Sequence, residues 1–149
     1  MGHVGLLPKI HFERLIKAEQ QAVFDVVANY ENFQNILPQY FPSVLVRSVR
    51  ENVAIVEEHL NLGKRELVMT TKHVTKHPDL HEIFVLGGDA KGSQIVEKYE
   101  KVSDGTKLVV DADIKLSGMS AIAGILAKKK IASDYGKIID EFAKIAEKR

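Results

Sequence analysis

The chain has 149 residues, of which 45% are apolar and 28% are charged, a balance typical of a globular domain and not of a disordered chain. This length fits one domain with a sizeable core. The formal net charge of +1 gives no electrostatic reason to expect nucleic acid as a partner. The sequence contains no Cys, which excludes disulfides, Cys-ligated metal sites and a Cys nucleophile.

The N-terminal segment has a short apolar patch before Pro8 but neither a basic region nor a long apolar stretch, so we expect no targeting signal in it. We expect a flexible leader over residues 1–8 and a single domain over residues 9–149. No run of about 18 apolar residues occurs, so we expect no transmembrane helix and a cytoplasmic location. The alternation in residues 9–16 predicts a first strand.

Two helices are predicted next. Apolar residues at spacings of three and four from Ala22 to Tyr30 indicate an amphipathic helix that begins near Ala18 or Glu19. A second, short helix is predicted over residues 31–37, because the prolines that follow it disfavour a continued helix.

From Ser43 onward the apolar period changes to two, which predicts a series of strands. Residues with turn propensity separate the strands, and Asp104-Gly105 is the strongest hairpin signal among them. Because the connections are short, neighbouring strands are expected to pair antiparallel. The predicted strands cover residues 44–50, 52–62, 65–76, 80–86, 92–102 and 106–116.

A long amphipathic helix is predicted to begin at Ser117 or Ser120 and to end near Lys148. It is the one long element available to cover the apolar face of the sheet, and the two short helices are expected to close one end. A curved sheet around one helix leaves room for an apolar cavity. The small residues over 117–124 either pack closely against the sheet or leave space at a cavity entrance.

The segment VFDVVANYENFQNILPQYFPSV over residues 23–44 resembles the START and birch-pollen-allergen superfamily, in particular its polyketide cyclase/dehydrase and coenzyme-Q-binding families. The stretch YEKVSDGTKLVV over residues 99–110 resembles the same families. The resemblance extends over about residues 9–147. It implies an α+β helix-grip fold of order β-α-α-β-β-β-β-β-β-α, in which a curved antiparallel sheet wraps around the C-terminal helix and encloses an apolar cavity.

Glu97 stands where these families often have an aromatic residue. If Ile95 and Tyr99 point inward, the period of two places Glu97 inside as well, where it would need a partner or a proton. It would then recognise a polar head group or act as a general base. The alternative is the opposite register or a position at the rim of the cavity.

Three histidines lie four residues apart in HVTKHPDLH, namely His73, His77 and His81. Pro78 and the strand patterns on both sides favour a hairpin over a helix, so the three side chains are expected to diverge and we expect no metal site and no cofactor. Lys128, Lys129 and Lys130 span most of a helix circumference. They form a solvated face, contact a membrane surface, or bring Lys128 inward to pair with Glu97.

The leading hypothesis is a binding module without catalytic residues, which holds a lipid, an isoprenoid quinone or a polyketide-like compound for transport or chaperoning. The alternative is a cyclase or dehydratase in which Glu97, His59 or His73 acts with Tyr99 or Tyr135. The sequence leaves open the ligand, the oligomeric state and which face of the strands over residues 53–62, 66–76 and 80–86 lines the cavity. The predicted cavity residues are Phe24, Val27, Phe33, Leu67, Met69, Phe84, Glu97, Tyr99, Leu108, Val110, Ala112, Ile114, Met119, Ile122, Tyr135 and Phe142.

Overall fold

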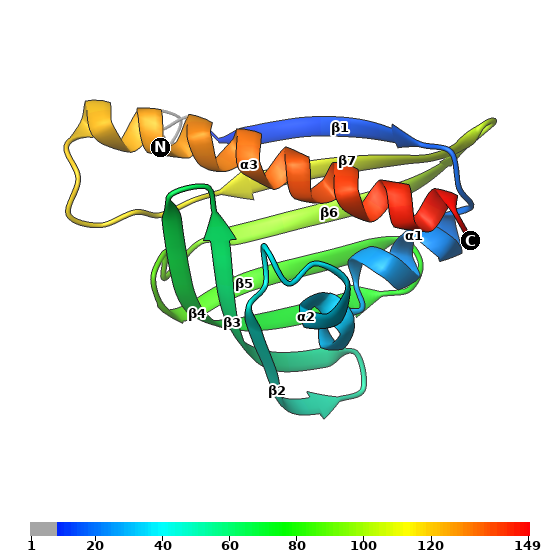
Figure 1. Cartoon of the computed structure of the whole chain (residues 1–149), viewed down its shortest axis with the longest axis horizontal. Helices are drawn as coiled ribbons and strands as arrows, with labels where there is room; N and C mark the ends of the chain where they lie inside the picture. The colour runs from blue at the N-terminus through cyan, green and yellow to red at the C-terminus, as the bar shows by residue number, and fades with distance from the viewer. Residues whose placement is uncertain (1–8) are drawn as a thin grey trace, which may run out of the picture.

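The computed structural model describes residues 9–149, and the predicted leader lies outside these residues. One seven-stranded sheet, a long C-terminal helix and a few short helical segments make up the described chain (Figure 1). The strand order is β1-β7-β6-β5-β4-β3-β2 and every pair is antiparallel. This arrangement confirms the predicted order of elements and the predicted fold class.

The strands are β1 (Ile10–Ile16), β2 (Ser43–Arg50), β3 (Val53–Leu62), β4 (Arg65–Lys76), β5 (Leu80–Gly88), β6 (Gln94–Val102) and β7 (Gly105–Asp113). The helices are α1 (Gln20–Val27), η2 (Tyr30–Asn32), α2 (Phe33–Ile36) and α3 (Ala121–Glu147). The last strand ends earlier than predicted. The amide of Lys115 donates to the hydroxyl of Ser93 at 2.8 Å, and the chain leaves the sheet there to reach α3.

The sheet bends around α3, which crosses its concave face in Figure 1. Register shifts between Val46 and Ser48 in β2 and between Thr70 and Thr71 in β4 accompany this curvature, since irregular pairing bends and twists a strand. Helix α3 begins at Ser120, whose hydroxyl accepts from the amide of Ala123 at 3.1 Å. This cap decides between the two predicted start residues, because a capping side chain satisfies an otherwise free helix amide.

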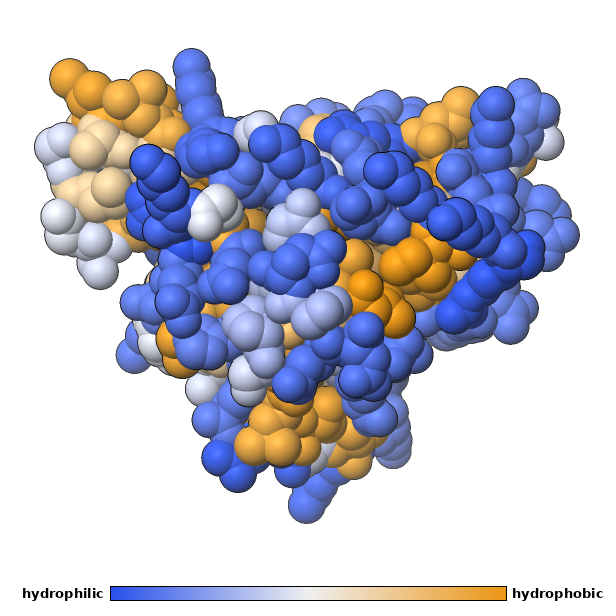
Figure 2. All heavy atoms as spheres, in the orientation of Figure 1, coloured by the Kyte–Doolittle hydropathy of each residue, from blue (hydrophilic) through white to orange (hydrophobic). Residues whose placement is uncertain are grey.

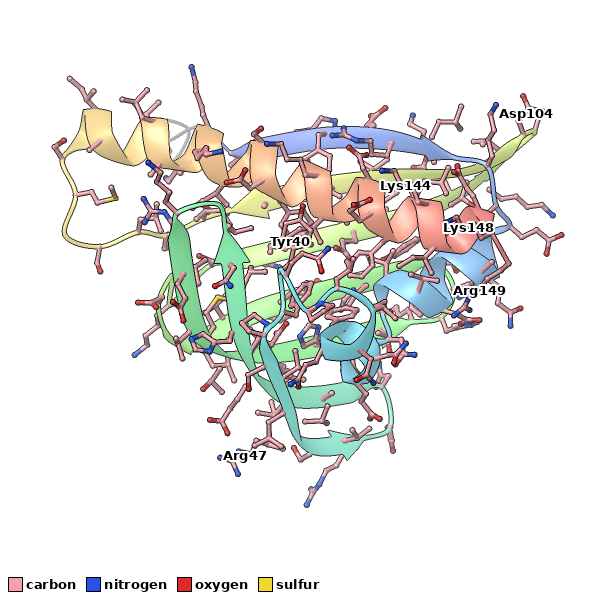
Figure 3. All side chains as sticks on the ribbon, in the orientation of Figure 1. Tyr40, Arg47, Asp104, Lys144, Lys148 and Arg149 are labelled. Carbon is pink, nitrogen blue, oxygen red and sulfur yellow. The ribbon has the colours of Figure 1, made fainter. Side chains whose placement is uncertain are left out.

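The core lies between the sheet and α3, and the short helices close one end of it. Phe33 of α2 packs against Phe41 and against Phe142 of α3, with ring centroids 4.7 and 5.0 Å apart. Each fully buried ring of this kind contributes roughly 1.5–3 kcal/mol to folding. Other charged side chains point outward, as Figure 3 shows for Arg47 on β2 and for Lys144 near the end of α3.

Candidate functional site

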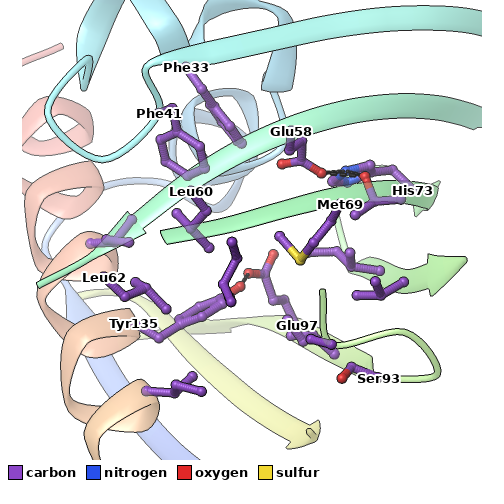
Figure 4. Close-up of a pocket in the computed structure, with 18 of the residues that line it drawn as sticks. Phe33, Phe41, Glu58, Leu60, Leu62, Met69, His73, Ser93, Glu97 and Tyr135 are labelled. Atoms are coloured by element: carbon purple, nitrogen blue, oxygen red, sulfur yellow. Dashed lines mark hydrogen bonds and ion pairs between the residues drawn. The ribbon is translucent and has the colours of Figure 1, made fainter. Parts of the chain in front are cut away.

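A cavity of about 80 Å³ lies between the concave face of the sheet and α3. Most of its wall is apolar, and its polar lining residues come mainly from the central strands (Figure 4). The apolar lining residues are Val27, Phe33, Phe41, Leu60, Leu62, Leu67, Met69, Ile83, Val85, Ala90, Ile95, Ile114, Ile131, Ile138, Ile139 and Phe142. The polar lining residues are Glu58, Thr71, His73, His81, Ser93, Glu97 and Tyr135.

Four of these polar residues form one chain of contacts across the sheet: Glu58 of β3, His73 of β4, His81 of β5 and Glu97 of β6. Oε2 of Glu58 lies 2.8 Å from Nε2 of His73, and Nδ1 of His73 lies 2.8 Å from Nε2 of His81. Nδ1 of His81 lies 2.7 Å from Oε1 of Glu97. We call these four residues the polar ladder. Each strand from β3 to β6 contributes one member, so the ladder crosses the middle of the sheet.

Strand register explains why the ladder members meet. His81 and Glu97 are direct partners across β5 and β6, and both face the interior. His73 is paired with Ile83, and because side chains alternate along β5, His81 lies diagonally opposite His73 on the same face. The rings of His73 and His81 lie edge to edge, with their centroids 5.0 Å apart and their planes at 22°, as the contact between their nitrogens requires.

Hydroxyl groups complete both ends of the ladder. Tyr99 donates to Oε1 of Glu97 at 2.8 Å, and Tyr135 of α3 donates to Oε2 of the same carboxylate. At the other end, Thr71 donates to Glu58 and lies within hydrogen-bond distance of Nε2 of His73. The bond from Tyr135 therefore connects α3 to the polar wall of the cavity, as Figure 4 shows.

Both carboxylates of the ladder are held ionised. Burial would raise the pKa of Glu97, but the charge of His81 and hydrogen bonds from His81, Tyr135 and Tyr99 outweigh it and lower this pKa below 4.5. The pKa of Glu58 is lowered in the same way, against burial, by His73 and Thr71. Burial and the nearby Glu97 charge raise the pKa values of Tyr99 and Tyr135 well above 10.0. The tyrosines therefore remain neutral donors.

The sequence-predicted cavity residues fall into three groups in the structure. One group lines the cavity: Val27, Phe33, Leu67, Met69, Glu97, Ile114, Tyr135 and Phe142. A second group is buried in the core around it without lining it: Phe24, Tyr99, Leu108, Val110 and Ala112. Among these, Tyr99 still reaches the site through its hydrogen bond to Glu97.

The third group, Phe84, Met119 and Ile122, lies away from the cavity and requires a correction. Phe84 follows the inward-facing Ile83 in β5, so alternation turns it to the outer face, where Lys72 lies over its ring. Met119 precedes α3 and lines an outer hollow instead. Ile122 is 74% exposed in the first turn of α3, where apolar side chains gather at the surface (Figure 2).

The prediction that the three histidines diverge is wrong for His73 and His81, although His77 does lie apart at the hairpin, exposed and 3.3 Å from Asp25. His59 also lies outside the cavity and pairs with Glu66 at 2.6 Å. Glu58 was missed. The period of two from Ala54 through Val56 places Glu58 on the buried face and is the signal that identifies it.

Lys128 is not the partner of Glu97. The carboxylate is hydrogen-bonded to His81 and to two tyrosine hydroxyls, and no ion pair to Lys128 occurs within residues 9–149. Lys128 is 8% exposed, and Lys130 pairs with Asp134 at 3.0 Å. The reason is geometric, because the pairing of β5 with β6 brings His81 directly opposite Glu97.

No group of three or more His, Asp and Glu side chains in the described range is arranged to hold a metal ion. Helices of the described chain are also too short or too polar to cross a membrane.

No protein-family model matches the sequence, and no curated protein matches it. Solved structures do match. TTHA0849 from Thermus thermophilus has a TM-score of 0.80 at 14% identity, covering 93% of this chain and 97% of that one. The Zhui aromatase/cyclase from Streptomyces sp. R1128 has a TM-score of 0.75 at 12% identity, covering 95% and 94%.

A START superfamily protein from Mycobacterium smegmatis has a TM-score of 0.66 at 12% identity, covering 95% of each chain. At such low identities these likenesses concern the fold. Together with the sheet wrapped around α3, they confirm the resemblance found in the sequence: the chain has the helix-grip fold of the START and aromatase/cyclase structures.

Proposed function

We propose that this domain binds a mainly apolar small molecule, bearing a polar group, between the sheet and α3. The observation that carries the proposal is the cavity, whose wall is apolar except for the polar ladder, the hydroxyl groups bonded to it and Ser93. Apolar walls supply affinity by burying hydrocarbon, while a few fixed polar groups orient the ligand. Glu58 and Tyr135, the latter held by its hydrogen bond to Glu97, would meet the polar group of the ligand.

The size of the cavity restricts the size and shape of the ligand. Its volume of about 80 Å³ is below the roughly 300–1,000 Å³ of sites for drug-sized molecules. An outer hollow of about 600 Å³ adjoins it and shares Leu67 and Ala90 with its wall. Movement of the Leu67 side chain would join the two spaces. The joined site favours a compact ring system, such as a polyketide-like compound or a quinone head, over a long lipid chain.

The outer hollow also suggests the route of exchange. It is lined by Ser117 and Met119, which belong to the segment of small residues before α3, and by Leu116. Gly118 in this segment has a φ of +75°, a conformation that favours glycine. A ligand for transport or chaperoning would enter and leave here, past Leu67.

Native mass spectrometry and solvent extraction of the purified protein test the binding function. We expect a stoichiometric apolar compound in the wild-type protein and a reduced amount in Leu67→Trp, which fills the opening. Val68→Trp is the matched control, because the neighbouring Val68 is 53% exposed on the outer face of the same strand. A protein that remains empty after incubation with quinones, fatty acids and aromatic polyketides would contradict the proposal.

The polar ladder favours a second candidate function, general acid–base catalysis of the cyclase or dehydratase kind. Glu97 and Tyr135 converge on the cavity within hydrogen-bond distance, as an acid–base pair requires, and an aromatase/cyclase is among the structures of similar fold. Mass spectrometry would follow loss of water from poly-β-ketone substrates. We expect turnover to fall at least 100-fold in Tyr135→Phe and to be unchanged in His59→Gln, which lies outside the cavity. Equal turnover in both variants would exclude this chemistry.

A further inference from the structure

The polar ladder has a definite number of protons. Each of its three contacts is 2.7–2.8 Å long, which requires one hydrogen between the two atoms. A contact without a hydrogen would bring two lone pairs together, and a contact with two would bring two hydrogens together. His73 and His81 provide four ring nitrogens, all of which take part in these contacts. Three hydrogens therefore satisfy the ladder, and neither two nor four can do so.

The proton count determines the charge. With Glu58 and Glu97 ionised, the three hydrogens lie on ring nitrogens, so one imidazole is charged and the other is neutral. Two negative carboxylates and one positive imidazolium give the ladder a net charge of −1. The central hydrogen is shared between His73 and His81, and either ring can carry the positive charge.

No lysine or arginine of residues 9–149 forms an ion pair with the ladder. The other groups that face it are uncharged: Thr71 of β4, Tyr99 of β6, Tyr135 of α3 and the ring of Tyr30 in η2, which lies 4.6 Å from His73. The negative charge therefore faces an apolar cavity without a compensating cation from the described chain.

Among the ladder and the hydroxyl groups bonded to it, the atoms that remain available to a ligand are acceptors. Oε1 of Glu58 has no hydrogen-bond partner among the described residues, and Glu58 lines the cavity. The hydroxyl of Tyr135 donates its hydrogen to Glu97, which leaves its oxygen free to accept. A ligand that donates a hydrogen bond would match these atoms. A ligand carboxylate would be desolvated beside a fixed charge of the same sign.

We infer that the ladder holds three protons at a net charge of −1, and that the cavity consequently selects ligands with a hydroxyl, phenol or amine group and rejects carboxylates. This ligand class rests on the binding function proposed above. The proton number rests on the ladder geometry alone.

Long-range proton–nitrogen NMR of the histidine rings at pH 7 measures the proton number. Protonation summed over the four nitrogens of His73 and His81 should equal three. In Glu58→Leu the ladder loses one acceptor, so the sum should fall to two, whereas the exposed Glu100→Leu should leave it at three. A wild-type sum of two or four, or an unchanged sum in a folded Glu58→Leu protein, would overturn the inference.

Three probes of similar size measure the selectivity: 4-ethylphenol, 4-ethylanisole and 4-ethylbenzoate, titrated by calorimetry at pH 7. We expect the phenol to bind at least tenfold more tightly than either of the others. Tighter binding of the benzoate, or equal binding of the phenol and the anisole, would overturn the selectivity. If none of the three binds, the binding function fails and the ligand class fails with it, while the NMR sum still decides the proton number.

Discussion

Two of the groups of histidine and carboxylate side chains on the described sheet differ in their surroundings. The polar ladder is buried between β3 and β6. A surface cluster on β1 and β7 contains His11, Glu13, Lys107 and Asp111, in which Nδ1 of His11 lies 2.6 Å from Asp111. His11 and Asp111 are 54% and 52% exposed, whereas His81 and Glu97 are 1% and 2% exposed in their side chains.

The comparison shows how burial changes the hydrogen bonding that the same residue types require. At the surface, water supplies missing hydrogen bonds, so a broken pair costs little. In the interior, each donor and acceptor needs a partner from the protein, because an unpaired buried charge is strongly unfavourable. The ladder therefore has a defined proton number and a defined geometry, while the surface cluster requires neither.

The largest expected effect is on Glu97. In Glu97→Ala, His81, Tyr99 and Tyr135 all lose their buried acceptor, and we expect the free energy of unfolding to fall by roughly 3–5 kcal/mol. Urea denaturation measures this loss. In the surface cluster, Asp111→Ala removes the acceptor of His11 and should cost less than about 1 kcal/mol. Similar losses in the two variants would remove the distinction between the clusters.

A double-mutant cycle on His73 and His81 should reveal coupling within the ladder. Once one ring is replaced by leucine, the other has already lost its partner, so the double replacement should cost less than the two single losses together. We expect a coupling energy of roughly 0.5–3 kcal/mol from urea denaturation of the three variants. Additive losses would mean that the rings act independently.

The pH dependence of stability follows from the shifted pKa values. The pKa values of Glu58 and Glu97 are lowered on folding, so their contribution is present above about 4.5 and is lost as the pH falls through the folded values. Tyr99 has a raised pKa, so its contribution is complete below 10.0 and is lost at higher pH. We expect a plateau between these limits in thermal unfolding, and a weaker acid dependence in Glu97→Gln. If stability falls with decreasing pH in Glu97→Gln as steeply as in the wild type, other carboxylates cause the acid dependence.

The smallest effect concerns the surface cluster. A hydrogen bond to Asp111 raises the pKa of His11 above 6.5; desolvation opposes it, and the charge of Asp111 and the hydrogen bond and charge of Glu13 add to it. In Asp111→Asn this pKa should move back toward 6.5, as followed by NMR titration, while stability changes by less than about 0.5 kcal/mol. A larger loss of stability would show that exposed pairs matter more here than the comparison implies.

Sequence patterns predicted the elements well because each element carries its own period. The apolar spacing in residues 22–30 indicated α1, and the alternation from Leu108 to Ala112 indicated β7. The ends of the strands and helices were predicted less accurately than their order. The predicted last strand continued to Leu116, but the bond from Lys115 to Ser93 turns the chain away, and that contact joins residues 22 positions apart.

The candidate site was predictable only in part. The alternation around Tyr99 placed Glu97 inside in one of the two registers left open, and the same reasoning applied to β3 would have included Glu58. The partners of Glu97 were different from those expected. Lys128 was considered because it is a cation on the covering helix, whereas the structure brings His81 to Glu97 through the pairing of β5 with β6.

The sequence by itself determined the order of the elements and the antiparallel pairing of consecutive strands, because these follow from local periodicity and short connections. Only the tertiary structure decided which inward polar groups meet. Alternation tells which residues of a strand share one face of the sheet. Which residue of the neighbouring strand lies opposite them depends on register, turns and irregular pairing. The polar ladder, with one member on each of four strands, is therefore a property of the folded sheet.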